Sequence, residues 1–261
     1  MNLDALWHDL ECGDYREDLP SWRSLAAATG GPVLDVGAGT GRVTLDLAAQ
    51  GLAVVALDTE AALLAALEHR ARGLAVQTLV ADARSFDCEH RFSLIVVPMQ
   101  TLQLLGGPDG RTAFLRCAYR HLKPGGLVAA ALADALDCFD EEHDAPPPPD
   151  ARDILEVRYA SQLLAVLADG GRAALHRRRE ITGPGRPRHA EDVVIHLDRV
   201  SAEEVAAEAA PLGFLAEPHR RIPESERYLG STIVVFRKPQ ERSLPDAQQR
   251  IEVLGAGRAG S

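Results

Sequence analysis

The fold of this chain is decided by the stretch Pro32-Val33-Leu34-Asp35-Val36-Gly37-Ala38-Gly39-Thr40-Gly41-Arg42-Val43. The apolar run 33–36 predicts a buried strand, interrupted by the single acid Asp35. Three glycines follow at alternate positions, and from Val43 onward apolar residues recur at helical spacing. This order predicts a concave pocket of backbone N–H groups at a helix N-terminus, where a Cβ would keep a ligand away from the backbone.

The spacing of the glycines narrows the choice of ligand. The dinucleotide fingerprint G-x-G-x-x-G needs glycine at position 42, where this chain has Arg42. The pattern is instead G-x-G-x-G, preceded by an acid, and it resembles the first motif of the class I S-adenosylmethionine-dependent methyltransferases. The resemblance implies that this motif binds S-adenosylmethionine through Asp35, Gly37, Ala38, Gly39, Thr40 and Gly41.

Two further acids follow predicted strands. The run 52–58 ends at Asp58, 21 residues after Gly37, and the resemblance implies that Asp58 and Thr59 meet the cofactor ribose. Taken alone, Asp58 also suits a nicotinamide cofactor or the first turn of the helix expected at 60–72. The run 75–81 leads to Asp82 and Ala83, which the resemblance places at the adenine. A turn cap is the alternative for Asp82.

The fourth predicted strand, 92–97, leads into Pro98-Met99-Gln100. In the family this position lies beside the transferring methyl group, so Pro98 and Met99 are implied cofactor contacts. Enzymes that methylate amides or nucleic-acid amino groups carry an Asn-Pro-Pro-Tyr type sequence there. Because this chain departs from that pattern, methylation of DNA adenine or of protein glutamine is disfavoured.

The rest of the core repeats the same alternation of helix and strand. A helix is expected at about 108–122, ended by Lys123-Pro124-Gly125-Gly126, with a strand at 127–133. This succession also resembles the family. Alternating strands and helices independently predict parallel βαβ units, so that residues 30–134 form a Rossmann-like cofactor-binding core.

Residues 1–29 are predicted to be helical and amphipathic, and both tryptophans, Trp7 and Trp22, lie here. They pack a helix onto the core, or they belong to a lid over the ligand pocket. In small-molecule methyltransferases an N-terminal segment often closes over the cofactor. The resemblance therefore implies that Tyr15 contacts the methionyl end of the cofactor.

Residues 135–200 depart from a minimal methyltransferase. An acidic run at 137–144 is a solvated loop or, alternatively, a metal site, and the prolines of 146–149 form a stiff spacer. Strand-like segments at 154–167, 172–181 and 192–200, with a hairpin signal at 169–171, predict an inserted antiparallel cap over the active-site mouth. The cluster 176–179, with its three arginines, is expected to be a charged solvent face; sites for an anionic substrate group or for nucleic acid are the alternatives.

Residues 201–239 are expected to complete the core. Ser201 and Glu204 match a capping box at the start of a helix, and the strands at 214–221 and 231–236 resemble the reversed C-terminal hairpin of the class I fold. The predicted fold is thus α/β: a seven-stranded, mostly parallel sheet with helices on both faces and the inserted cap. The polar residues 240–261 are predicted to be a mobile tail.

Composition limits the partners of the protein. The net charge of −10 over 261 residues argues against a nucleic-acid partner. No signal peptide and no membrane-spanning run is apparent, and the scattered cysteines suggest neither zinc nor a disulfide framework. We therefore expect a cytoplasmic protein that holds no metal ion and binds no membrane; a homodimer is left open.

The expected activity is methyl transfer to a nitrogen, oxygen or carbon of a small molecule, by direct displacement and mainly through positioning. Candidate catalytic side chains are Tyr15, Gln100, Gln103, Tyr159 and His196, with His8 in the lid; core packing or a surface role is the alternative for the tyrosines and histidines. Alternative functions are a non-catalytic S-adenosylmethionine or S-adenosylhomocysteine binder or partner subunit, non-methyl chemistry with the same cofactor, and nicotinamide-dependent oxidoreduction.

Overall fold

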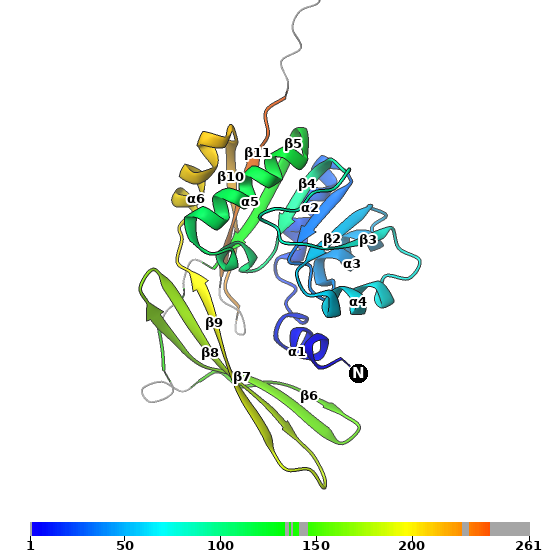
Figure 1. Ribbon diagram of the computed structural model, residues 1–261, viewed down its shortest axis with the longest axis vertical. Helices are drawn as coiled ribbons and strands as arrows, with labels where there is room; N and C mark the ends of the chain where they lie inside the picture. The colour runs from blue at the N-terminus through cyan, green and yellow to red at the C-terminus, as the bar shows by residue number, and fades with distance from the viewer. Residues whose placement is uncertain (1, 134–135, 137, 141–145, 226–229, 241–261) are drawn as a thin grey trace, which may run out of the picture.

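The computed structural model describes residues 2–133, 136, 138–140, 146–225 and 230–240. They form two sheets, one of seven strands and one of four, which lie at opposite ends of the view in Figure 1. The predicted mobile tail lies outside the described residues except for Gln240, as does most of the acidic run 137–144.

The seven-stranded sheet has the predicted architecture. It consists of β1 (Val33–Val36), β2 (Val54–Asp58), β3 (Val76–Val80), β4 (Phe92–Val97), β5 (Leu122–Leu132), β10 (Leu215–Ile222) and β11 (Ser231–Arg237). Its spatial order is β10-β11-β5-β4-β1-β2-β3, and β1 to β5 are parallel. β11 is antiparallel to both β5 and β10, which confirms the reversed C-terminal hairpin. The central strands are buried on both faces, and for this reason their sequences are continuous apolar runs rather than alternating apolar and polar residues.

Helices cover both faces of this sheet. They are α2 (Leu19–Thr29), α3 (Arg42–Ala49), α4 (Ala61–Arg70), α5 (Gly107–His121) and α6 (Ala202–Ala209); the chain also has α1 (Leu3–Cys12) and the short 3-10 turns η1 (Thr101–Leu104) and η2 (Ala210–Leu212). On one face, α5 and α6 bury Phe114 and Val205. On the other face, α2 and α3 bury Trp22 and Leu47, while α4 buries Leu67 beside β2.

The N-terminal segment is helical, as predicted, but it forms two helices. α1 ends at Cys12, where the N–H of Gly13 caps it by donating to the Asp9 carbonyl. α2 begins at Leu19 with Pro20 in its first turn, where the missing N–H of proline costs nothing. The break separates α1 from α2, so that α1 lies between the two sheets (Figure 1).

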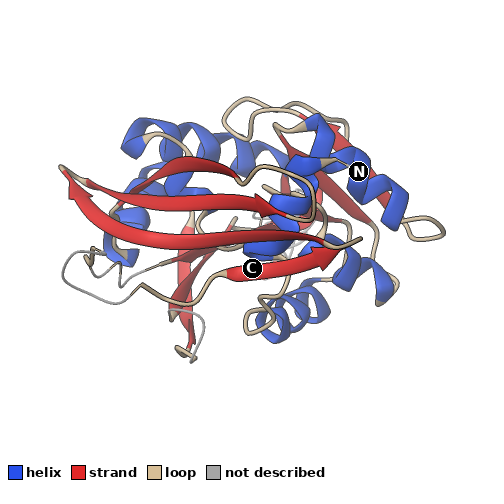
Figure 2. Cartoon of the chain, turned by 90° about the horizontal axis from the view of Figure 1, so that it is seen from below, coloured by secondary structure: helices blue, strands red, loops and turns tan. Residues whose placement is uncertain are grey.

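The four-stranded sheet is the antiparallel insertion, with the order β6 (Asp150–Ile154), β7 (Val157–Asp169), β8 (Arg172–Thr182) and β9 (His189–Asp198). Viewed from below, its long strands run across the end of the core (Figure 2). The predicted strand 154–167 was too simple, because a turn with positive φ at Leu155 and Glu156 separates β6 from β7. That turn carries no glycine or asparagine, the residues that normally announce such a conformation.

Two local predictions had different outcomes. The capping box is confirmed, since Ser201 Oγ accepts from the Glu204 N–H and the Glu204 carboxylate accepts from the Ser201 N–H. The helix expected at about 108–122 does end, at His121, but residues 123–126 already belong to β5, which pairs with β4 across a register shift. Within the described part of the chain, no helix is both long and apolar enough to cross a membrane.

Candidate functional site

The candidate site is a cavity that lies where the strand order of the main sheet reverses. The chain crosses from one half of the sheet to the other between β1 and β4, a point where open α/β sheets commonly bind ligands. A cavity of about 890 Å³ opens there, walled by the ends of β1, β2 and β4, by α1 and by the four-stranded cap. Its size is that of a small-molecule site.

The glycine loop on the cavity wall differs from the predicted cradle of free N–H groups. The N–H groups of Gly37 and Ala38 donate to the Leu57 carbonyl at 2.8 and 3.0 Å, and that of Gly41 donates to the Ala38 carbonyl at 2.9 Å. The Gly39 N–H donates to Asp58 Oδ2 at 2.8 Å. Because these donors are engaged within the protein, the loop is poorly equipped to bind the phosphates of a dinucleotide.

The three glycines also make room for protein side chains. A Cβ built on Gly37 would lie 2.6 Å from the Thr101 side chain, and one on Gly41 would lie 2.2 Å from Leu67. A Cβ on Gly39 would lie 2.1 Å from Nε2 of His8. The glycine pattern is therefore required by close packing of α1, α4 and η1 on the loop, in addition to any ligand.

Asp35 supplies the principal electrostatic feature of the cavity. Its Oδ2 accepts from Thr44 Oγ1 at 2.6 Å, whereas its Oδ1 is buried and has no hydrogen-bond partner among the described residues. Burial raises the pKa of Asp35 to about 7, since removal from water disfavours the carboxylate. An unpartnered buried oxygen on a cavity wall calls for a donor from a ligand, and a cation would satisfy it best.

Two acids at the ends of β2 and β3 also line the cavity. Asp58 already accepts from the Gly39 N–H and, through Oδ1, from the Glu60 N–H at 2.9 Å. Each oxygen can accept a second hydrogen bond. Asp82 accepts from the Arg84 guanidinium through both carboxylate oxygens, and these hydrogen bonds lower the pKa of Asp82. The ribose and helix-start interpretations of Asp58 are thus compatible, because the same carboxylate can serve both.

Tyr15 lies in the cavity wall, and the side chain of Arg42 packs against its ring. The Arg42 guanidinium stands 5.0 Å from the centre of the Tyr15 ring and donates to the Tyr15 carbonyl at 3.0 Å. Arg42 also forms two hydrogen bonds with Asp18, which in turn accepts from the Trp22 indole N–H at 2.8 Å. The arginine that replaces the dinucleotide glycine therefore fastens the N-terminal segment to the core.

The cap forms the opposite wall, and the sequence did not indicate its composition. Its lining is apolar at Leu163, Val166, Leu175, Ile195 and Leu197. At the seam with α1, Glu11 accepts from Arg179 at 2.7 and 2.9 Å, and Arg177 donates to Asp150 at 3.1 Å. The predicted solvent face at 176–179 was wrong for these two arginines; Arg178, on the other face of β8, pairs with Asp192.

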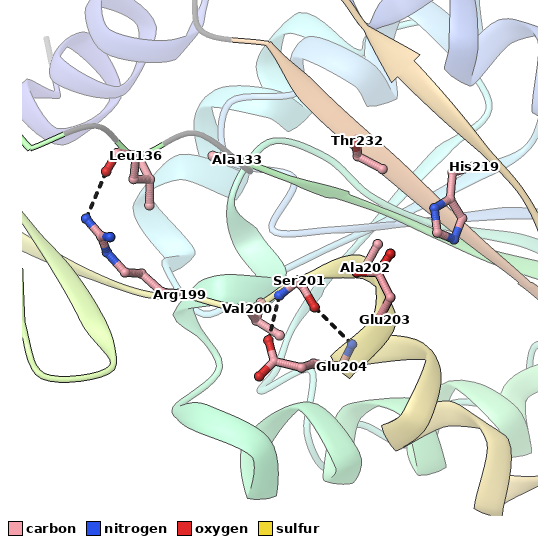
Figure 3. Close-up of a pocket in the computed structure, with 10 residues that line it drawn as sticks. All are labelled: Ala133, Leu136, Arg199, Val200, Ser201, Ala202, Glu203, Glu204, His219 and Thr232. Carbon is pink, nitrogen blue, oxygen red and sulfur yellow. Dashed lines mark hydrogen bonds between the residues drawn. The ribbon is translucent and has the colours of Figure 1, made fainter.

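A second cavity, of about 450 Å³, lies between the end of β9, the start of α6 and β11. Figure 3 shows that three of its polar residues are paired within the protein: Arg199 donates to the Leu136 carbonyl, and Ser201 and Glu204 form the capping box. The glycine loop and Asp35 line the larger cavity instead. We therefore place the functional site in the larger cavity.

Comparison with known proteins agrees with this placement. Residues 33–126 match the family model described as "Methyltransferase domain". This part of the chain is thus similar to a methyltransferase domain. A curated relative, the cypemycin N-terminal methyltransferase of Streptomyces sp, is 31% identical over 144 residues, covering 55% of this chain and 56% of the relative. The matched region thus spans little more than half of that protein.

Solved structures share the architecture around the methyltransferase domain. An amino pentose methyltransferase from Micromonospora echinaspora superposes with a TM-score of 0.68 at 19% identity, covering 91% of this chain and 97% of that one. A sugar N-methyltransferase from Streptoalloteichus sp gives 0.71 at 16% identity, covering 92% and 94%. At these identities the likeness shows the fold, cap included.

The residues of the methyltransferase domain fit S-adenosylmethionine. This cofactor carries an ammonium group and a sulfonium but no phosphate, which suits both the unpartnered Asp35 Oδ1 and the engaged N–H groups of the loop. Of the predicted cofactor residues, the cavity wall contains Tyr15, Asp35, Gly37, Ala38, Asp58, Thr59, Asp82, Ala83, Pro98 and Met99. Gly39, Thr40 and Gly41 do not line the cavity; His8 packs against Gly39, and the Thr40 hydroxyl donates to Asp9.

The predicted catalytic residues divide into two groups. Tyr15 and Gln100 line the cavity, but Gln103, Tyr159 and His196 do not. Tyr159 packs edge-on against Trp7 with ring centres 5.9 Å apart, and His196 lies on the outer face of the cap beside Asp169. These positions follow from strand alternation in the cap, which the sequence leaves unassigned. Among the described residues, no group of metal-ligating side chains could hold an ion.

Gln103 has a structural task instead. Its Oε1 accepts from the Ala133 N–H at 2.9 Å, and its Nε2 donates to the carbonyls of Ala133 and Asp198 at 3.3 and 3.0 Å. The side chain, which is 1% exposed, therefore joins the end of β5 to the end of β9, where the chain leaves and re-enters the core.

Proposed function

We propose that this protein transfers a methyl group from S-adenosylmethionine to an amine nitrogen of a small molecule. The observation that carries the proposal is the buried Asp35 Oδ1, which lacks a partner among the described residues and belongs to a residue that lines a cavity of small-molecule size. When bound, the cofactor supplies an electrophilic methyl group on its sulfonium sulfur. The matched methyltransferase domain, 33–126, supports this chemistry.

The cofactor assignment follows the cavity wall. Asp35 would hold the ammonium group, Asp58 and Thr59 the ribose, and Asp82 with Ala83 the adenine. Tyr15, Pro98 and Met99 would border the methyl-bearing part. Met99 has a φ of 54°, a left-handed backbone that is rare without glycine and is typical of functional turns.

An amine acceptor is supported by the charge of the cavity. The carboxylates on its wall are Glu11, Asp35, Asp58, Asp82 and Asp150, against the three guanidinium groups of Arg42, Arg84 and Arg177. Because Glu11, Asp82 and Asp150 are ion-paired with arginines, the excess of carboxylates comes from Asp35 and Asp58, which would favour a cationic group. The relatives named above act on an N-terminus, on an amino pentose and on a sugar nitrogen. Oxygen and carbon acceptors are the other outcomes of a substrate screen.

The protein contributes positioning and exclusion of water. The apolar cap wall, with Leu163 and Val166, would hold the substrate body against the end of β4, where the Gln100 amide can orient a polar group. Burial raises the pKa of Tyr15, so its hydroxyl stays a neutral donor near pH 7. No dedicated base is required for an amine that reaches the site in its neutral form.

Calorimetric titration with S-adenosylmethionine, S-adenosylhomocysteine and NAD tests the proposal. Binding of the first two without NAD, followed by methylation of amines detected by mass spectrometry, is expected. Binding of NAD alone would overturn the cofactor assignment. Binding of S-adenosylmethionine without turnover on any amine, phenol or acidic carbon would indicate a non-catalytic binding protein. A cytoplasmic location, a homodimer and the absence of nucleic-acid binding remain predictions.

A further inference from the structure

His8 of α1 lies against the glycine loop at the edge of the cavity. Its Nε2 atom is the one that a Cβ on Gly39 would meet, and the residue lines the cavity wall. The ring is half-buried, and its electrostatic surroundings include the carboxylate of Asp58. His8 thus faces the same part of the cavity as the acid at the end of β2.

The hydrogen bonds of Thr40 determine the tautomer of His8. The Thr40 hydroxyl has a single proton, which it donates to Asp9 Oδ1 at 2.6 Å. Its contact with His8 Nδ1, at 3.2 Å, therefore requires Nδ1 to carry the proton and to donate it. Arg70 reinforces this arrangement by binding Asp9 through both carboxylate oxygens.

The remaining ring nitrogen is consequently an acceptor. Nε2 forms no hydrogen bond with the described residues. Burial lowers the pKa of His8, since removal from water disfavours the imidazolium, although the carboxylates of Asp58, Asp9 and Glu11 oppose this effect. At pH 8 the ring is neutral, and Nε2 is an acceptor beside Gly39 on a residue that lines the cavity.

We propose that His8 Nε2 and the Asp58 carboxylate together accept hydrogen bonds from the two hydroxyl groups of the cofactor ribose. The inference rests on the proposed function, because it assumes that S-adenosylmethionine binds here. Both groups are pure acceptors beside each other, and a vicinal diol offers two donors. Gly39 is then needed because a side chain there would push His8 out of reach of the ribose.

Two near-isosteric substitutions separate this role from a purely structural one. In His8→Asn the side-chain amide reaches the Nδ1 position and can keep the contact with Thr40, but it offers nothing at Nε2. In His8→Gln the amide oxygen reaches the Nε2 position and the contact with Thr40 is lost. If His8 only docks α1 on the glycine loop, His8→Asn should bind the cofactor more tightly than His8→Gln. If Nε2 contacts the cofactor, His8→Gln should bind it more tightly than His8→Asn.

The experiment measures S-adenosylhomocysteine binding at pH 8 by calorimetry, with thermal unfolding as the control for folding. We expect His8→Asn to weaken binding about tenfold, which is the size of one lost hydrogen bond. His8→Gln keeps an acceptor at the Nε2 position and should weaken binding less than about threefold. Equal affinities for wild type and His8→Asn, or the reverse ranking of the two variants, would overturn the inference. Absence of binding by the wild type would instead overturn the proposed function.

Deoxy analogues of the ligand provide an independent readout. The 2′-deoxy or the 3′-deoxy analogue of S-adenosylhomocysteine, whichever lacks the hydroxyl bound by Nε2, should bind wild type about tenfold more weakly than the parent compound. The same analogue should bind His8→Asn almost as well as the parent compound does. If neither penalty shrinks in the variant, His8 does not contact the ribose.

Discussion

Arg42 and Asp18 form a buried two-point ion pair, with Nη1–Oδ1 and Nη2–Oδ2 distances of 2.5 and 2.8 Å. The pair joins α2 to the start of α3, directly after the glycine loop. Truncation of Asp18 would leave the Arg42 charge buried without compensation, so we expect Asp18→Ala to lower the free energy of unfolding by ~3–5 kcal/mol. Chemical denaturation measures this loss.

A matched control for this prediction lies on the same two helices. Arg23 of α2 binds Asp46 of α3, but the arginine is exposed. Arg23→Ala should leave stability almost unchanged, because exposed ion pairs are well screened by water. The double variant Asp18→Leu/Arg42→Met should be more stable than Asp18→Ala. A loss from Arg23→Ala as large as that from Asp18→Ala would refute the assignment of the anchoring role to the buried pair.

The raised pKa of Asp35 predicts a pH-dependent stability. With a pKa of about 7 in the folded protein and about 3.9 unfolded, the folded state holds the extra proton between these values, so stability falls as pH rises through this window. Asp35→Asn removes this loss and should stabilise the ligand-free protein by up to about 4 kcal/mol at pH 8 and only about 1.5 kcal/mol at pH 5. Denaturation at the two pH values measures both. A gain that does not depend on pH would contradict the raised pKa.

The same carboxyl predicts proton release when a cationic ligand binds. A ligand ammonium group would stabilise the Asp35 carboxylate, so S-adenosylmethionine should bind more tightly at pH 8 than at pH 6 and displace a proton near pH 7. Calorimetry in buffers with different heats of ionisation measures the released proton. Asp35→Asn should bind weakly at both pH values; proton release that persists in this variant would assign it to another group.

Asp58 holds both the loop and, by our proposal, the ribose. Asp58→Ala should weaken S-adenosylmethionine binding more than tenfold, because it removes a charged acceptor, and it also leaves the Gly39 N–H without its partner. Asp58→Asn keeps one oxygen for Gly39 and should restore folding stability more than affinity. Titration combined with thermal unfolding separates these effects, and unchanged affinity in Asp58→Ala would reject the ribose assignment.

Gln103 is expected to affect stability rather than catalysis. Gln103→Leu leaves the buried N–H and carbonyl of Ala133 and the carbonyl of Asp198 without this partner, at a cost of about 2–4 kcal/mol in the free energy of unfolding. Turnover per folded molecule should change little, as measured well below the unfolding temperature. A large fall in turnover with normal stability would show instead that Gln103 takes part in catalysis.

The sequence predicted the core well because its determinants are local. The glycine loop, the acids Asp58 and Asp82 and the capping box at Ser201 each occupy a few consecutive residues, and the order of strands follows from their alternation with helices. The sequence therefore suffices to predict the cavity residues that these segments contribute.

The cap side could not be predicted in the same way. Arg179 and Glu11 are 168 residues apart, and the register that brings them together depends on a bulge in β7 and on the docking of α1. The face to which Tyr159 or His196 points depends on that register, because a shift of one residue reverses every side chain. Neither the amino-acid composition nor the local sequence pattern indicates which distant residues of the cap and α1 will be in contact.

α1 contacts the glycine loop through His8 and Asp9, and the cap through Glu11 and Trp7. One helix thus borders both halves of the cavity. A ligand in one half that changes the order of α1 alters the affinity for a ligand in the other half, and thermodynamic reciprocity requires the effect to be equal in both directions. The methyl donor and the methyl acceptor would then not bind independently, because the ten-residue helix α1 couples the affinity for one to the presence of the other.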